Sequence, residues 1–440
     1  MKKSMLGLLS TCLVIPMLSA CGSNTVNQAN RETPAKMSEQ KQPESIVELK
    51  MMPYSTSTNQ EDFEQYMKPS IEKKFPNIKV EWIQPDKNKS LDTLIASGQV
   101  PDIVITGYST LPVLRQKDFP QDLNQLVKKN KTDLNVFEPN ALQSVKIYGE
   151  NGELFMLPYS TIFLATFYNK DIFDKFGVPY PKENQSWEEL IELAKKLTRT
   201  VDGISYRGLL PHYNHSLIGK GLSLSLVDPK TNKAVLNTDR WLETARLVKG
   251  IYSIPGNEKP IAPDKPFVEG TMAMMPYWGQ ATVLKLQNQT KAGNPINWDM
   301  IAYPHFKSEP GKNFEIVTNV YTLSKVSKNQ EAAYNVISYL STSEEVQSLA
   351  LKYGNLPSIK MQGAEANFGS ALPELKGKNI AGLFKSNYRE NHLPSKYDPI
   401  AIEAFNNQMN SMLKGEIDER TALQKAEEEA NKKIASEMLK

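Results

Sequence analysis

The stretch FVEGTMAMMPYWG, from Phe267 to Gly279, guides the expected fold of the chain around it. Its first four residues are expected to form the last turn of a short helix, with Gly270 in the left-handed conformation that ends such helices. The run Met272–Met275 is apolar throughout and short enough for a strand buried on both faces. Pro276 is expected to end the hydrogen-bonded ladder because it has no backbone N–H.

Two aromatic residues, Tyr277 and Trp278, follow this strand and are expected in the loop after it. In open α/β sheets ligands bind outside the carboxyl ends of the strands. Trp278 is therefore either a ligand contact or an ordinary core side chain, and the sequence leaves both interpretations open.

The first residues have the pattern of a secretory signal. Lys2 and Lys3 precede an apolar run, Met5–Met17, which is too short to span a bilayer. The small residues at 18–20 are followed by Cys21, and this resembles the bacterial lipoprotein box, in which the cysteine is acylated. The alternative is a plain signal peptide with a chance cysteine. We expect a lipoprotein signal peptide at 1–20, lipidation of Cys21, and a flexible polar tether at 21–44.

The composition excludes several classes of function. The net charge of +3 is small for 440 residues, and no basic stripe interleaved with aromatics suggests nucleic acid. The second cysteine, Cys12, leaves with the signal, so the mature chain has no cysteine for a disulfide or metal site. His212 and His215 lie close together but lack an acidic partner for a metal. Nucleotide-binding, serine-hydrolase and zinc-protease motifs are absent. We expect no metal, no cofactor and no catalytic residues.

The segment after the tether alternates strands and helices. Strands are expected at 46–52, 78–82 and 101–107, with helical patterns at 63–75 and 91–95 between them. This order predicts a parallel sheet with right-handed crossovers. Further along, Ser186 and Glu189 form a capping box that starts another helix. About four hundred folded residues are too many for one core, so two domains are expected.

Short motifs in a fixed order carry a family resemblance. They are SGQVPDI (97–103), NGELFMLPY (151–159), FYNK (167–170), SWEEL (186–190), the opening stretch, DMIAYP (299–304), SKVSKNQEAA (324–333) and GNLP (354–357). Together with the lipoprotein box, they resemble the bacterial extracellular solute-binding proteins of ABC importers, in particular the sugar-binding group that includes maltose-binding protein. The resemblance covers nearly the whole mature chain.

The resemblance implies an α/β fold of two periplasmic-binding-protein-like lobes with mostly parallel sheets and a ligand cleft between them. Three hinge crossings are then expected, at 159–162, near 303–304 and at 341–343. Lobe I would hold residues 45–160 and 304–341, and lobe II would hold 161–303 and 342–440.

The implied function is capture of a carbohydrate outside the cell and its delivery to the transmembrane subunits of an ABC permease by cleft closure. The protein would be a monomer, not an enzyme, anchored by lipid to the outer face of the cell membrane. The alternatives are a secreted lipoprotein enzyme acting on glycans, or a binding protein for another solute such as a polyamine or a peptide.

Sugar recognition needs flat apolar faces together with polar groups at strand ends. The candidate ligand contacts are Tyr54, Ser55, Tyr108, Ser109, Tyr159, His212, Tyr213, Tyr277, Trp278 and Asn319. By resemblance, Trp278 matches a stacking tryptophan and 211–214 matches an aromatic cleft loop. The relatives carry carboxylates in the loops that match 54–59 and 107–110, whereas here those loops hold hydroxyls and amides.

Replacing Cys21 by Ser is expected to release the protein from membranes or leave it unprocessed, because stable anchoring needs the acyl chains on the thiol. Detergent phase partitioning of the wild type and the Cys21→Ser variant measures this. Equal partitioning of both would contradict the lipoprotein interpretation.

Overall fold

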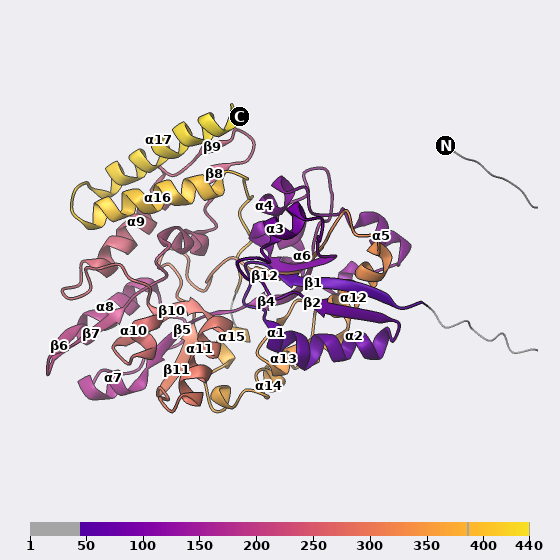
Figure 1. The fold of residues 1–440 in the computed structure, drawn as a ribbon. Coiled ribbons are helices and arrows are strands. Elements are labelled where there is room, and N and C mark those ends of the chain that lie inside the picture. Colours follow the sequence, from indigo (N-terminus) through magenta and orange to yellow (C-terminus); the bar gives the residue numbers. More distant parts are fainter. Residues whose placement is uncertain (1–44, 385–386, 440) are drawn as a thin grey trace, which may run out of the picture. The chain divides into compact units, whose positions relative to one another are not determined.

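The computed structural model describes residues 45–384 and 387–439, so the predicted signal peptide, tether and Cys21 lie outside the described residues. The strands of the described part form two main sheets, each with its own helices (Figure 1). We call these the first lobe and the second lobe.

The sheet of the first lobe has six strands in the order β13-β4-β12-β3-β1-β2. They are β1 (Val47–Pro53), β2 (Ile78–Trp82), β3 (Ile103–Gly107), β4 (Leu157–Ile162), β12 (Val317–Leu323) and β13 (Leu356–Pro357). The first three strands of the chain are parallel neighbours, as the sequence predicts.

The sheet of the second lobe has five strands in the order β11-β5-β10-β7-β6. They are β5 (Leu164–Asn169), β6 (Arg199–Val201), β7 (Ile204–Leu209), β10 (Met272–Trp278) and β11 (Trp298–Ala302). A separate small ribbon pairs β8 (Val227–Asp228) with β9 (Lys233–Ala234).

The expectation of mostly parallel sheets is wrong, because both sheets are mixed. β12 is antiparallel to β3 and β4, and β5 is antiparallel to β10 and β11. The reason is the crossing of the chain between lobes. A strand that follows a crossing segment begins where the two lobes meet and runs away from that junction. Its neighbours in the sheet run toward the junction and end there. β12 is that strand in the first sheet, and β5 is that strand in the second.

Helices flank both sheets. The first lobe carries α1 (Gln60–Asp62), the π-helical η1 (Phe63–Met67), α2 (Lys68–Lys74), α3 (Leu91–Ala96), η2 (Tyr108–Thr110), α4 (Leu111–Gln116), α5 (Asn124–Lys129), η3 (Leu134–Val136), α6 (Pro139–Lys146), α12 (Gln330–Thr342), α13 (Glu344–Lys352) and α14 (Ala364–Asn367). The second carries α7 (Lys170–Phe176), α8 (Trp187–Leu197), η4 (His215–Leu222), α9 (Asp239–Tyr252), α10 (Asp264–Val268), α11 (Gly279–Lys291), η5 (Pro373–Leu375), α15 (Ala381–Phe384), α16 (Asp398–Leu413) and α17 (Glu419–Met438).

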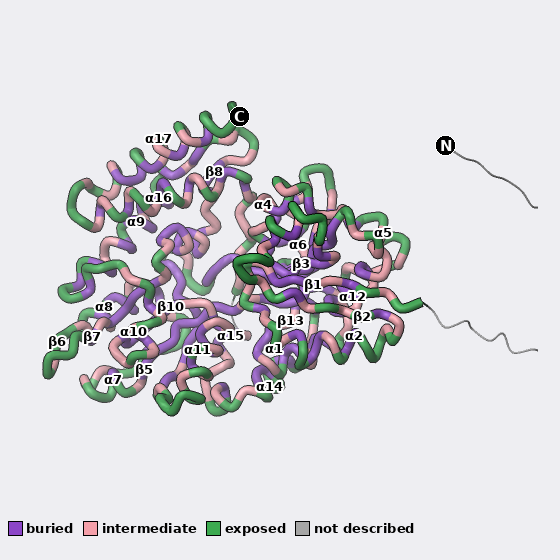
Figure 2. Tube along the Cα trace, in the orientation of Figure 1, coloured by how far each residue is buried: buried purple, intermediate pink, exposed green. Residues whose placement is uncertain are grey.

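Apolar burial follows the sheets (Figure 2). All residues of β5 and β12 are buried, as expected for inner strands of a sheet that is covered on both faces. The capping box predicted at Ser186 and Glu189 is confirmed at the start of α8, whose buried face includes Trp187. Among the described residues, no helix is both long and apolar enough to cross a membrane.

The opening stretch folds largely as predicted. α10 ends just before Gly270, which has a φ of 75°, and Met272–Met275 are buried in β10. However, Pro276 does not end the strand, and Tyr277 and Trp278 are its last residues rather than loop residues. The carbonyl of Met274 accepts a hydrogen bond from Leu210, after β7. In a strand, the backbone polar groups of every second residue point toward the same neighbouring strand, so those of Met274 and Pro276 both point toward β7. Because β7 has ended before it reaches Pro276, the missing N–H of Pro276 costs no hydrogen bond of the sheet.

The expected third crossing at 341–343 is also wrong. After α12 the chain stays on the first lobe, because α13 packs on α12 and β13, and Leu356 of β13 pairs with Thr161 of β4. Residues 342–357 therefore belong with the first lobe, not with the second as expected. Burial of Val346 and Leu351 in α13 holds this segment there. The other predicted lobe boundaries stay predictions.

Helix α8 lies very close to β7, and this contact makes a testable prediction. A Cβ at Gly208 in β7 would overlap backbone atoms of Ala194 in α8. Gly208→Ala is therefore expected to reduce the free energy of unfolding by about 1–3 kcal/mol, as overpacking does. The matched control is Gly250→Ala in α9, where the nearest atom would be Ile191 Cδ1 at an ordinary 3.6 Å.

In the control, the added methyl is expected to stabilise the protein by about 0.5–1 kcal/mol, since glycine inside a helix is unfavourable. Urea denaturation measures the change in the free energy of unfolding, which should be negative for Gly208→Ala and positive for Gly250→Ala. A neutral Gly208→Ala would contradict the close packing of α8 on β7.

Candidate functional site

The strand registers place the predicted contact residues at one junction between the lobes. In the first sheet Gly107 pairs with Asn319, and Ile162 at the end of β4 pairs with Val317. In the second sheet Trp278 pairs with Leu164, which is separated from β4 by the single residue Phe163. The carboxyl ends of β1, β3, β7 and β10 therefore all face the crossing. Open α/β folds bind ligands at such strand ends.

On the side of the first lobe, Ser55 and Ser109 are exposed hydroxyl residues at the ends of β1 and β3. Ser55 has a φ of 51°, the left-handed region, so the chain turns sharply directly after Tyr54. The ring of Tyr54 is half-buried against a small apolar cluster beneath α3. The two serines are thus accessible for hydrogen bonding, whereas Tyr54 is largely committed to packing.

Tyr159 and Asn319 are buried and already have partners. The ring of Tyr159 stacks on Tyr321 with centroids 4.3 Å apart, and its hydroxyl contacts Thr58. Burial raises the pKa of Tyr159. Asn319 donates to Ser160 Oγ at 3.1 Å and accepts from Thr56 Oγ1 at 3.1 Å. Both residues brace the loop after β1, and direct contact with a ligand stays a prediction for them.

Tyr108 makes a contact across the junction. It is buried, and its hydroxyl accepts from Lys220 Nζ at 3.2 Å and from Asn391 Nδ2 at 3.1 Å. Lys220 belongs to η4, which packs on α9 and α16 of the second lobe. Its ammonium also contacts Glu315 Oε2 at 3.3 Å, and His392 Nδ1 lies 2.7 Å from the other oxygen of that carboxylate.

The Glu315 carboxylate at this contact is fully buried. Burial acts to raise its pKa, but the charge of Lys220 and the hydrogen bonds of His392 outweigh it and hold the pKa below its usual value. Burial alone would lower the pKa of Lys220, yet the oxygens of Tyr108 and Glu315 raise it. Removing one partner would leave an uncompensated buried charge, so this pair ties the lobes together in the form described.

The second lobe contributes what we call the aromatic group, His212, Tyr213, Tyr277 and Trp278. The ring of His212 stacks on Tyr213 at 4.3 Å and on Tyr277 at 5.2 Å, and it meets Trp278 edge-on at 6.4 Å. The side chain of Tyr213 is 58% exposed. Burial lowers the pKa of His212 to about 4, so its ring is neutral at neutral pH. The structure therefore brings these predicted residues together as a set of flat, uncharged faces.

Trp278 is half-buried and packs against the apolar core, so a ligand contact and a core role both stay open for it. Its indole meets Phe314 edge-on at 6.2 Å, and its carbonyl accepts from Thr282 in the first turn of α11. The next residue, Gly279, has no room for a side chain because a Cβ there would overlap the ring of Phe163. The indole is thus held firmly at the junction, and stacking on a ligand stays a prediction.

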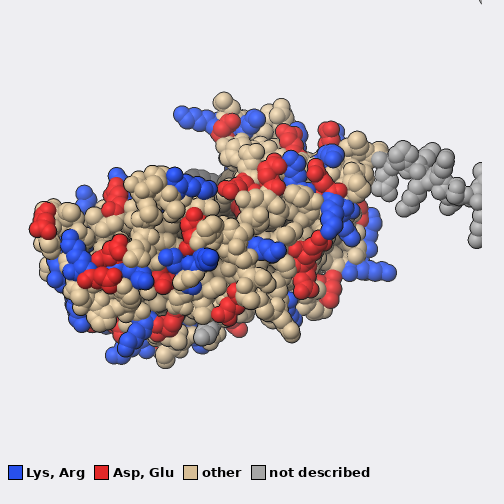
Figure 3. All heavy atoms as spheres, turned by 90° about the horizontal axis from the view of Figure 1, so that it is seen from below, with Lys and Arg blue, Asp and Glu red and all other residues tan. Residues whose placement is uncertain are grey.

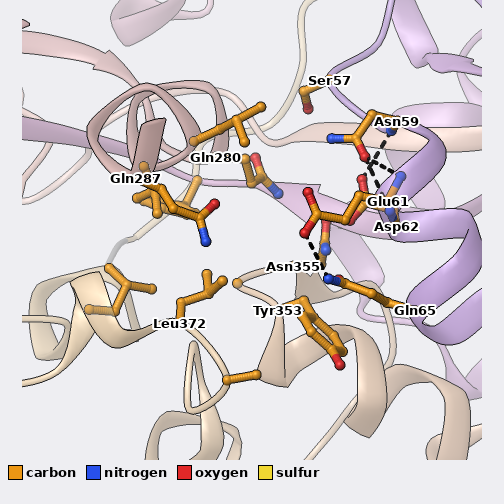
Figure 4. Close-up of a pocket in the computed structure, with 16 residues that line it drawn as sticks. Ser57, Asn59, Glu61, Asp62, Gln65, Gln280, Gln287, Tyr353, Asn355 and Leu372 are labelled. Atoms are coloured by element: carbon orange, nitrogen blue, oxygen red, sulfur yellow. Dashed lines mark hydrogen bonds between the residues drawn. The ribbon is translucent and has the colours of Figure 1, made fainter. Parts of the chain in front are cut away.

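Sequence reasoning missed a pocket of about 130 Å³ between α1 and α11 (Figure 4). None of the predicted contact residues lines it. Its polar side chains include Asn59, Glu61 and Asp62 from the first lobe and Gln280 and Gln287 from α11. The sequence suggested that the loop after β1 carried no carboxylates, but Glu61 and Asp62 follow directly in α1 and face this pocket. No sequence motif signals it, because its two walls meet only after the lobes have folded.

The described residues contain no group of three or more His, Cys, Asp or Glu side chains that could hold a metal ion. His215 is buried against Tyr252, with ring centroids 5.4 Å apart, rather than paired with His212 on a common ligand. Burial lowers the pKa of His215 to about 4.

Comparison with known proteins establishes the family. Residues 54–347 match the model of the bacterial extracellular solute-binding proteins, and the chain belongs to this family. The family is described as extracellular, which places its members outside the cytoplasm. It consists of binding proteins rather than enzymes.

Relatives in sequence are distant. A protein of Brucella abortus and one of Brucella suis, each described as a putative binding protein, are 25% identical over 290 residues. These matches cover 62% of this chain and 66% of each relative, so the chain spans just under two thirds of their length.

Solved structures share the fold. A substrate-binding protein of Listeria monocytogenes in complex with cycloalternan is 22% identical, with a TM-score of 0.71 over 89% of this chain and 100% of that chain. A sugar transporter protein of Rhizobium etli in an open conformation is 21% identical, with a TM-score of 0.67 over 87% and 99%. A maltodextrin-binding domain of Bdellovibrio bacteriovorus bound to maltotriose is 19% identical, with a TM-score of 0.62 over 88% and 100%. These likenesses show the two-lobe fold.

Asp62 provides a prediction about stability and pH. Burial raises its pKa from 3.8 to about 6, against the opposing hydrogen bonds from Asn59 and Asn355. A raised folded pKa means that the folded state binds the proton more tightly. The resulting stability is fully present below pH 3.8 and is lost as the pH rises through about 6. Asp62→Asn keeps an acceptor for the Asn59 N–H and removes the charge.

At pH 7 the free energy of unfolding of Asp62→Asn is expected to exceed that of the wild type by about 1–3 kcal/mol. This difference in stability should vanish near pH 4. Urea denaturation across pH 4–7.5 measures it. The control is Glu61→Gln, at an exposed position in the same turn. Its free energy of unfolding should stay close to that of the wild type across this pH range. A pH-independent effect of Asp62→Asn would contradict the raised pKa.

Proposed function

We propose that this solute-binding protein captures a carbohydrate outside the cell and delivers it to the transmembrane subunits of an ABC permease. The family supports the transport role. Several proteins with the same fold hold sugars, such as cycloalternan and maltotriose. At these identities the likeness carries the fold alone, so the case for a carbohydrate rests on the chain's own side chains.

The observation that carries the proposal is the aromatic group at the junction. A pyranose presents an apolar C–H face and a rim of hydroxyls. Half-exposed aromatic rings can stack on the C–H face, and exposed hydroxyl side chains can form hydrogen bonds with the hydroxyl rim. Trp278 and Tyr277 lie at the end of β10, and Ser55 and Ser109 follow β1 and β3, whose ends face the same crossing. Because the ring of His212 is neutral, the aromatic group carries no charge that an uncharged ligand would bury without a partner.

Delivery requires that the liganded form differ from the empty one. Two lobes joined by a few crossing residues close as a hinge. The ligand shifts the equilibrium only by the difference between its affinities for the closed and open forms. The contact of Tyr108 with Lys220 is one contact between the lobes that such closure can make or break. We further propose that the protein acts as a monomer, held by lipid on Cys21 at the outer face of the membrane.

The proposal is tested by a thermal-shift screen of the purified protein against mono- and oligosaccharides, with polyamines and short peptides as the competing classes. A sugar should raise the melting temperature, and it should reduce the radius of gyration in small-angle scattering as the cleft closes. Stabilisation by a polyamine or a peptide alone would contradict the carbohydrate assignment.

Trp278→Ala is expected to weaken binding of the sugar found in the screen by about 1–3 kcal/mol, the effect of removing an aromatic contact. The unliganded melting temperature should stay nearly unchanged, because the indole is only half-buried. Calorimetric titration and an unliganded melt measure the two quantities. A loss of apo stability of roughly 3–5 kcal/mol, with unchanged affinity per folded molecule, would instead indicate a structural role.

A further inference from the structure

The loop between β7 and η4 carries two members of the aromatic group, His212 and Tyr213. Its backbone is irregular, so neither a sheet nor a helix fixes the two rings. Asn214, the last residue of the loop, contacts both of its ends. The backbone N–H of Asn214 donates to Nδ1 of His212 at 3.0 Å, and its side-chain Oδ1 accepts from the N–H of Ser216 at 3.2 Å. Asn214 thus caps η4 and holds the imidazole ring at the same time.

A second amide attaches this loop to a helix that comes 192 residues later in the chain. Nδ2 of Asn406 in α16 donates to Oδ1 of Asn214 at 2.9 Å, and Oδ1 of Asn406 accepts from the backbone N–H of His215 at 3.0 Å. α16 itself packs against α17, α9 and η4 in the second lobe (Figure 1). Asn406 therefore connects two successive residues of the chain after β7 to the helices of this lobe.

The donors and acceptors in this pair of amides are fixed by the backbone. A backbone N–H can only donate, so the atom of Asn406 that faces His215 is its oxygen, and its nitrogen then faces Asn214. By the same argument, the atom of Asn214 that faces the N–H of Ser216 is its oxygen. Neither amide can turn over without placing two donors or two acceptors together. The contact is therefore specific to an amide side chain at each position.

The same rule decides where His212 carries its proton. Nδ1 accepts from the backbone of Asn214, so the proton of the neutral ring is on Nε2. Burial lowers the pKa of His212 to about 4, although the charge of Asp264 acts in the opposite direction. Protonation of Nδ1 would also break the hydrogen bond from Asn214. The loop therefore presents a neutral imidazole with one N–H donor, which an oxygen atom can accept and a cation cannot.

We propose that Asn406 is a positioning residue for the aromatic group, and through it for sugar binding, which rests on the function proposed above. Its side chain is not one of the stacked rings, and it acts through Asn214 and His215. By holding these two residues, it keeps the ring of His212 stacked on Tyr277 and keeps the proton of that ring on Nε2. A ligand then meets rings that are already in place, so less conformational freedom is lost on binding.

The test begins without a ligand, by nitrogen NMR of protein labelled at its histidines. The chain has four histidines, and the His212→Ala variant identifies the signals of His212. In the wild type, Nε2 of His212 should be protonated, Nδ1 should not, and the ring should titrate near pH 4. Asn406→Ala removes both hydrogen bonds to the loop. It should mix the two tautomers of His212 and raise its pKa by about one unit or more, because the released ring gains contact with water.

Two further variants separate positioning from general stability. Asn406→Leu also removes the amide but nearly keeps its volume, so it should have the same effect on His212 without leaving an empty space. The matched control is Asn407→Ala, at the next residue of α16, which contacts Glu429 of α17 at 3.4 Å instead of the loop. It should leave the tautomer and the pKa of His212 unchanged. A purely structural Asn406 would lower the melting temperature when replaced and leave both properties of His212 as in the wild type.

Calorimetry with maltotriose as the probe then measures the consequence for binding. Asn406→Ala should weaken binding per folded molecule about fivefold or more, whereas Asn407→Ala should not. When His212 is already replaced by Ala, adding Asn406→Ala should weaken binding much less, because Asn406 acts through that ring. Failure of the wild type to bind maltotriose would count against the proposed function, whereas the NMR measurement decides the positioning of His212 by itself.

Three results would overturn the role of Asn406. They are a wild-type His212 protonated on Nδ1, an unchanged tautomer and pKa of His212 in both Asn406 variants, and the same change in Asn407→Ala as in Asn406→Ala. Equal weakening of maltotriose binding by Asn406→Ala with and without the ring of His212 would also overturn it, since Asn406 would then act by another route.

Discussion

The crossing of the chain between the two sheets is the constraint on which the rest of the structure depends. β4 passes through the single residue Phe163 into β5, and β12 enters the first sheet from the second crossing. Each entering strand must run away from the junction, so its neighbours end there. The mixed sheets, the meeting of four strand ends and the position of Trp278 beside Leu164 all follow from this one geometrical fact.

Around that junction the chain places three environments with different chemistry. The aromatic group offers flat neutral faces, the contact of Lys220 with Glu315 forms a buried charge pair, and the pocket between α1 and α11 offers carboxyl and amide groups. The face seen in Figure 3 mixes both signs of charge. The aromatic group proposed as the sugar site is therefore uncharged, whereas charged side chains connect the lobes.

Local signals in the sequence were sufficient for individual elements. The strand at 78–82 and the capping box at Ser186 were predicted residue for residue, because periodicity and capping depend on neighbours in sequence. Pro276 was misjudged for a different reason. A proline breaks a strand only where a neighbouring strand still runs beside the edge on which its N–H is missing. That neighbour here is β7, which lies more than sixty residues earlier in the chain.

The sequence by itself determined the class of fold, the family and the residues gathered at strand ends, because those properties follow from patterns that repeat along the chain. Tertiary structure alone decided the mixed strand directions, the attachment of α13 and β13 to the first lobe, and the exposure of each candidate side chain. It buried Tyr159 against Tyr321 and left Tyr213 exposed, although both are tyrosines in junction loops or strands. It also joined Asp62 to Gln280 in one pocket. Contacts between distant segments depend on packing of the whole body, and no local pattern of residues encodes them.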